Sequence, residues 1–150
     1  MSTTQLLTEA LAVAADGLHA SAVSVGTGTT GAIDLGTFGQ VLFVIDTGTL
    51  GASATVDFAV VGSSTSGGSY SAISGTSITQ INASGKYALV LVTAEKIQSL
   101  GTGIRYIKGQ VTVGTATSTV SILALGVLTD YEPASANNPA AVVQTVNLWR

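Results

Sequence analysis

The scarcity of charge constrains this chain more than any other feature of its sequence. Only 9% of the 150 residues are charged, whereas about 25% are charged in an ordinary soluble domain. Serine and threonine together occupy 37 positions and glycine occupies another 18, a composition that favours strands and turns. Because so little charge is left to keep copies of the chain apart, we expect a β-rich subunit that is buried in a larger assembly.

Length and charge exclude several classes of protein. A chain of 150 residues is one domain by length, and its hydrophobic content of 46% can supply a core. Five basic residues cannot form a surface that follows a phosphate backbone, so we expect no binding of nucleic acid. The chain has no cysteine, which excludes disulfides and thiolate chemistry. The N-terminus lacks the basic start of a secretory signal, and the uncharged residues 109–129 are too rich in Gly, Ser and Thr for a membrane-spanning helix.

The composition divides the chain into three regions. Residues 1–18 place leucine and alanine at helical spacing, which predicts an N-terminal arm or short helix. Residues 19–130 form the body, in which short apolar runs alternate with turns rich in glycine and serine. Residues 131–150 contain both prolines and end in apolar residues, so we expect an extended C-terminal tail.

The body is predicted to consist of strands. Residues 53–61 alternate between apolar and polar side chains, which is typical of a half-buried antiparallel strand. Residues 41–45, 87–92 and 120–128 are apolar on both faces, so we expect their second face to be covered as well. Residues 104–113 carry charged side chains among apolar ones, which indicates a partly exposed strand.

The number and spacing of these strands predict the fold class. About eight short strands with regular turn signals are typical of an all-β chain, an antiparallel β-sandwich that is most simply a jelly roll. Residues 94–100, between two of the strands, are predicted to form a helical turn.

One glycine pattern has the form of a dinucleotide-binding loop. Gly26, Gly28 and Gly31 have the spacing of that motif, and Asp46 follows at a suitable distance. The chemistry requires the last glycine to open a helix whose N-terminus receives the pyrophosphate. Residues 32–36 (Ala-Ile-Asp-Leu-Gly) do not continue as a helix. We therefore predict a β-turn at these glycines and no cofactor.

The titratable residues do not form a recognisable catalytic or metal-binding motif. His19 is the only histidine, and Asp16 is the carboxylate near it in sequence, which is too little for a zinc site. A Ser–His–Asp arrangement assembled in space stays open, although no local serine-hydrolase motif is present. The other carboxylates are scattered, and the few aromatic residues do not suit a sugar-binding cleft. We assign no catalytic or metal-binding residue and do not expect an enzyme.

The end of the tail carries the only tryptophan, Trp149. It can either fold back on the body of its own chain or insert into a neighbouring subunit, where buried tryptophan is common among interface hot spots. The second interpretation, together with the apolar character of both ends, predicts that the terminal segments form protein interfaces. The candidate interface residues are Leu6, Leu7, Leu11, Val143, Val146, Leu148 and Trp149.

Several short motifs resemble those of small structural proteins of tailed bacteriophages. These motifs are residues 67–70 (Gly-Gly-Ser-Tyr), Ile73 and Ile78, residues 86–91 (Lys-Tyr-Ala-Leu-Val-Leu), residues 103–107 (Gly-Ile-Arg-Tyr-Ile) and residues 111–114 (Val-Thr-Val-Gly). Within that group, the chain is most similar to a capsid decoration, or cement, protein with a jelly-roll body. The resemblance rests on structural positions in residues 67–128 and brings no active site with it.

The resemblance implies a virion protein that is made in the host cytoplasm and works on the capsid exterior. It implies a homo-oligomer, most simply a trimer, that binds the major capsid protein and clamps capsid subunits together against internal pressure. The composition agrees with this role, because few charges keep the desolvation cost of contacts low. Two alternatives stay open: a receptor- or carbohydrate-binding β-sandwich module of a phage fibre or tail, and a small hydrolase on the same fold.

Overall fold

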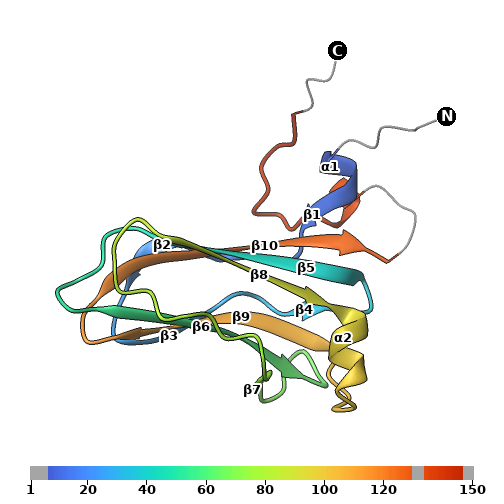
Figure 1. Ribbon diagram of the computed structural model, residues 1–150. Helices are drawn as coiled ribbons and strands as arrows, with labels where there is room; N and C mark the ends of the chain where they lie inside the picture. Colours follow the sequence, from blue (N-terminus) through green and yellow to red (C-terminus); the bar gives the residue numbers. More distant parts are fainter. Residues whose placement is uncertain (1–6, 130–133, 147–150) are drawn as a thin grey trace.

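The protein is an all-β sandwich, as the strand pattern predicts (Figure 1). The computed structural model describes residues 7–129 and 134–146. Two antiparallel sheets of five strands each pack face to face, and we call them sheet A and sheet B. Their facing surfaces enclose a core of valine, isoleucine and phenylalanine side chains.

Sheet A contains the first and last strands of the body. Its members are β1 (Leu11–Val13), β2 (Leu18–Val23), β5 (Phe38–Thr47), β8 (Tyr87–Thr93) and β10 (Ser118–Leu128). The strand order is β1-β10-β5-β8, and β2 pairs with the same edge of β10 further along that strand. Strand β8 therefore forms one border of the sheet.

Sheet B is built from the remaining strands. Its members are β3 (Gly26–Thr29), β4 (Ile33–Asp34), β6 (Thr55–Ser63), β7 (Ser71–Ala72) and β9 (Tyr106–Gly114). The order is β3-β9-β6-β7, and β4 also pairs with β9. Two short helical elements lie outside the body strands, α1 (Leu7–Ala10) and the 3₁₀ helix η1 (Ala134–Asn137), and a third, α2 (Ala94–Ser99), follows β8.

The alternating pattern of residues 53–61 explains how the layers pack. In β6, Val56, Phe58 and Val60 are buried on the inner face, and Asp57 lies on the outer face. The Phe58 ring meets the Phe43 ring of β5 across the core, with ring centroids 5.7 Å apart and a tilted geometry, which is a favourable arrangement for aromatic pairs. The prediction of a half-buried strand is confirmed.

Helix α2 confirms the predicted helical turn and closes one end of the sandwich (Figure 1). Thr93 caps its start, because the Thr93 Oγ1 accepts a hydrogen bond of 3.2 Å from the backbone N–H of Lys96. Such a cap satisfies one of the free donors of a first helical turn. Ile97 anchors the helix by turning into the core, where its side chain is buried.

The N-terminal helix is shorter than the helical spacing of residues 1–18 predicts. Helix α1 has four residues, and the chain then enters sheet A, where Leu11 opposes Val127 of β10. A short helix is marginal on its own, whereas pairing with β10 satisfies backbone groups and buries Ala12. The region boundaries at residues 18 and 130 stay predictions.

The predicted β-turn at Gly26, Gly28 and Gly31 is wrong for its first part. Residues Gly26–Thr29 form strand β3, in which Gly26 opposes Val113 and Gly28 opposes Val111 of β9. The partner strand comes more than eighty positions later in the sequence, so a local reading of the glycines could not reveal it. The segment does not open a helix, in agreement with the prediction that it lacks dinucleotide-loop geometry.

Candidate interaction surface

The outer faces of the two sheets differ in polarity. On sheet B, strands β6 and β9 place Asp57, Lys108, Gln110 and Thr112 on the outer face. On sheet A, the equivalent positions of the three long strands are mostly apolar. The asymmetry indicates that sheet A is the side of the sandwich suited to contact with another apolar surface.

Strand β8 contributes the most exposed part of this surface. Tyr87, Leu89 and Leu91 are 71%, 67% and 61% exposed, respectively. Side chains alternate along a strand, so the intervening Ala88 and Val90 turn toward the core and are half-buried. The same alternation therefore places three large apolar side chains of β8 side by side on the outer face.

The strand register extends this surface across the sheet. Leu89 opposes Val44 of β5, which in turn opposes Leu123 of β10. A second row lies two residues away along each strand, where Leu91 opposes Leu42 and Leu42 opposes Leu125. We call the whole surface the apolar face, and it comprises Leu42, Val44, Tyr87, Leu89, Leu91, Leu123, Leu125 and Val127.

The apolar face corrects one expectation from the sequence. Residues 87–92 and 120–128 are apolar on both faces, which predicts a covered second face. Among the described residues, however, nothing covers Tyr87, Leu89 or Leu91, and Leu123 and Val127 of β10 are exposed as well. Single exposed apolar residues are ordinary, but contiguous patches of roughly 300–600 Å² on one chain are commonly functional. The face is therefore a candidate binding surface.

Strand β8 is also open at its edge. Within the described residues it pairs only with β5. The backbone N–H of Thr47 donates to the carbonyl oxygen of Lys86 at 2.9 Å, and hydrogen-bonded pairs alternate along an antiparallel ladder. The backbone groups of Tyr87, Leu89 and Leu91 therefore point to the open edge.

The open edge carries none of the usual protection against pairing. Natural edge strands are commonly blocked by lysine, proline or a bulge, but Tyr87–Thr93 reads Tyr-Ala-Leu-Val-Leu-Val-Thr. On sheet B, by contrast, the edge of β6 is covered by residues 71–81. Their backbone N–H groups donate to β6 from Ile73 and Ile81 at 2.8 and 2.9 Å. The edge of strand β8 can therefore pair with another strand.

The C-terminal segment starts beside the apolar face. Asn138 Oδ1 accepts a hydrogen bond of 2.7 Å from the backbone N–H of Val13 in β1. Ala141 and Val142 then help to line a hollow of about 270 Å³ together with Leu123. Beyond it, Val143 and Val146 are 96% and 73% exposed, and Figure 1 shows this part of the chain leading away from sheet A.

The structure places the predicted interface residues in different surroundings. Leu7 lies exposed on α1, and Leu11 is half-buried where β1 pairs with β10. Leu6, Leu148 and Trp149 lie outside the described residues. Sequence reasoning missed the β8 part of the surface. The sequence signals this surface by residues 87–92, which are apolar on both faces, but that pattern predicts a strand covered on both faces.

His19 and Asp16 lie at the rim of the hollow beside the tail. The Nε2 atom of His19 is 3.2 Å from Asp16 Oδ1, and both side chains are well exposed. Ser121 of β10 also lines this hollow. An exposed contact of this kind contributes little to stability, and the geometry gives the three residues no enclosed position for a substrate.

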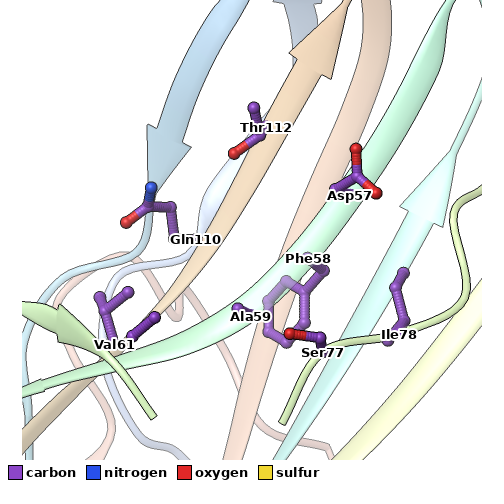
Figure 2. A pocket seen from close by; sticks show the side chains of 9 residues that line it. Asp57, Phe58, Ala59, Val61, Ser77, Ile78, Gln110 and Thr112 are labelled. Carbon is purple, nitrogen blue, oxygen red and sulfur yellow. The ribbon is translucent and has the colours of Figure 1, made fainter. Parts of the chain in front are cut away.

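A second hollow lies on sheet B and has a mixed lining. Figure 2 shows Asp57 and Ala59 of β6 beside Thr112 and Gln110 of β9, with Ile78 of the covering segment opposite. Its volume is about 260 Å³. The Asp57 carboxylate already accepts a hydrogen bond of 2.9 Å from the side-chain amide of Gln80. The hollow is thus a shallow groove in which the one carboxylate is engaged by its own chain.

Two further searches concern metals and membranes. Across residues 7–129 and 134–146, His, Asp and Glu side chains nowhere gather in groups of three or more that could hold a metal ion. In the same ranges, none of the helices has the length and apolar character required to cross a membrane.

Comparisons with known proteins add no family to this description. No protein-family model matches the chain, and no curated protein sequence matches it either.

Proposed function

We propose that this chain is a structural subunit of a bacteriophage virion that assembles through its apolar face. The observation that carries the proposal is the largely apolar outer face of sheet A, whose side chains are most exposed on the open strand β8. Together with the motifs in residues 67–128, this surface supports a capsid decoration protein that binds the major capsid protein on the capsid exterior. The working form is a homo-oligomer, most simply a trimer.

The energetics of apolar contacts suit this role. Burial of apolar surface contributes roughly 25 cal/mol per Å², and specific interfaces bury about 1,200–2,000 Å² in total. The apolar face has one carboxylate at its border, Asp46, which opposes Tyr87 in the register. A partner can therefore cover the leucines without removing an unpaired charge from water, a step that would oppose binding.

The strand order supports a jelly roll as the finer description of the sandwich. If β1 with β2 and β3 with β4 are each taken as one interrupted strand, eight strands remain. Their order is then 1-8-3-6 in sheet A and 2-7-4-5 in sheet B, so successive strands wrap around the sandwich in pairs. An eight-stranded double sheet of this kind is common among capsid proteins.

The first test is deletion of residues 140–150. The described part of this segment makes few contacts, because Val143 and Val146 are exposed, and Asn138 with its hydrogen bond to Val13 is retained. We expect a folded body that no longer forms the oligomer or no longer binds capsids of the phage that encodes it. Light scattering gives the mass, and co-sedimentation with capsids gives the occupancy.

The same assay separates the alternatives. A full-length chain that forms a closed oligomer and co-sediments with capsids supports the proposal, and the variant Thr112→Lys on sheet B serves as a control that should behave like the wild type. Normal capsid occupancy after the deletion would contradict a role for the tail. A well-behaved monomer without capsid binding would favour a binding module of a fibre or tail.

A further inference from the structure

The apolar face and the C-terminal segment are both apolar and both exposed in the single chain, so each could cover the other between two copies. The face needs an occupant that brings apolar side chains, few charges and backbone groups for the edge of β8. We propose that this occupant is the C-terminal segment of a second copy, residues 143–150, which binds along β8 as an added strand. This inference rests on the homo-oligomer of the proposed function and names the contact that holds it together.

The sequence of the segment matches these requirements. Residues 143–150 read Val-Gln-Thr-Val-Asn-Leu-Trp-Arg, with four apolar residues and a single charge at the last position. Valine, threonine and tryptophan are enriched in strands. In an added strand side chains alternate, so either Val143 with Trp149 or Val146 with Leu148 lies on the same face as the exposed side chains of β8. The backbone of the segment then pairs with the open edge in β-augmentation.

The segment is also long enough. Eight extended residues span at most about 26–29 Å, whereas neighbouring strands of a sheet are only about 4.8 Å apart. Strand β8 itself has seven residues. The segment therefore has enough residues to pair along the whole of β8 of a second copy that lies next to Val142.

The direction of the tail favours exchange between copies. Within one chain, Val143 and Val146 stay exposed, and the described part of the segment, residues 143–146, leads away from sheet A (Figure 1). The face of the same chain stays exposed as well. If each copy donates its segment to the next copy and receives the segment of the previous one, both apolar surfaces are covered in every copy of a closed ring.

Engineered cysteines test the contact directly, because the natural chain has none. Two chains of different length, one carrying Leu89→Cys and the other Val146→Cys, are co-expressed and then oxidised. A disulfide requires Cα atoms about 4.4–6.8 Å apart, so the pairs Leu91→Cys with Val146→Cys and Leu89→Cys with Val143→Cys are included to allow for register. Thr112→Cys on sheet B replaces the β8 cysteine in the matched control.

We expect a covalent dimer that contains one chain of each length, formed by a β8 cysteine with a tail cysteine and lost in the Thr112→Cys control. Three results would overturn the inference. One is a product between two β8 cysteines alone, which means face-to-face packing. Another is an intrachain bond, without any product between chains, in a single chain that carries both Leu89→Cys and Val146→Cys. The third is the lack of any product in samples that are oligomeric.

The mass of the same samples by light scattering keeps the two proposals separate. An oligomer without the expected crosslink overturns the exchange of C-terminal segments but does not contradict the proposal of a virion subunit. A monomer overturns the homo-oligomer and the exchange together. Deletion of residues 143–150 provides a second measurement, since it should abolish the oligomer while the far-UV circular dichroism of the body is retained.

Discussion

Gly109 lies where the aromatic side chains of the two sheets meet. A Cβ atom built on Gly109 would be 2.9 Å from Cδ1 of Phe43 and 3.0 Å from Cε2 of Phe58. Real Cβ atoms essentially never approach another heavy atom more closely than 3.0 Å, and close-packed protein interiors transmit such strain to their neighbours. At this position the residue with no side chain is therefore part of the packing of the Phe43–Phe58 pair.

The substitution Gly109→Ala should destabilise the protein. Overpacking of a filled core costs about 1–3 kcal/mol, so we expect the free energy of unfolding in urea to fall by that amount. Gly67→Ala is the matched control, because nothing lies within 4 Å of a Cβ atom at that position, and its effect should stay within about 0.5 kcal/mol. Equal stability of the two variants would contradict this account of the core.

An ion pair ties β4 to the segment that precedes β9. Arg105 donates from Nε and Nη2 to the two carboxylate oxygens of Asp34 at 3.0 and 2.9 Å. These hydrogen bonds are the largest reason that the pKa of Asp34 lies below its ordinary value of 3.8; partial burial opposes the effect, and the backbone N–H of Gly36 adds to it. The charged form of Asp34 is thus favoured by the fold.

The direction of this pKa shift sets a pH dependence. A carboxyl group with a lowered pKa in the folded state stabilises the fold above its unfolded pKa, and this contribution is lost as the pH falls through the lowered value. Asp34→Asn should therefore be less stable than the wild type near neutral pH, by on the order of 0.5 kcal/mol because the pair is partly exposed. The difference should vanish in acid, below both pKa values. Urea unfolding across a pH series measures it, and parallel curves would contradict the assignment.

At the scale of the element, β8 is the strand that we propose to carry the contact between copies. It combines an open edge, an uncharged sequence and three exposed apolar side chains. A strand of this kind is a template for association unless a charge interrupts it. The strand should therefore be more important for assembly than for the stability of one chain.

The substitution Leu89→Lys tests this division of roles. Leu89 is mostly exposed, so the chain should still fold, with unchanged far-UV circular dichroism. The buried lysine charge should raise the apparent dissociation constant of the oligomer at least about tenfold, or about 1.4 kcal/mol. Thr112→Lys places the same charge on sheet B, where Thr112 is exposed, and should leave the mass unchanged. A wild-type mass for Leu89→Lys by light scattering would contradict the role of β8.

At the scale of the whole molecule, the chemistry of the surface predicts how the oligomer responds to conditions. Screening by salt shortens the range of charge interactions from about 10 Å at 0.1 M to about 3 Å at 1 M, but an apolar interface does not depend on them. Apolar association weakens on cooling. We therefore expect a mass that is unchanged by sodium chloride over this range and an oligomer that dissociates more readily near 4 °C than at 25 °C. Dissociation by salt alone would indicate a charged interface instead.

Local patterns in the sequence determined the class of the fold and much of its core. The alternation of residues 53–61 predicted which side of β6 is buried, and the helical turn at α2 was visible between two strands. These features are predictable because alternation and capping depend on neighbouring residues. The low charge and the apolar tail were likewise readable from composition alone.

The tertiary structure decided where each strand lies in its sheet, and this placement creates the candidate surface. Residues 87–92 are as apolar on both faces as residues 41–45. Strand β5 is paired at both edges and its outer side chains are half-buried, whereas β8 stands at the border and its outer side chains are exposed. Leu11–Val13 belong to a pattern that predicts a helix but form a strand at the edge of β10, and Gly26–Thr29 form a strand that pairs with β9. For these last two segments the deciding partner is distant in the sequence, and hydrogen bonding and burial with that partner outweigh the local preference.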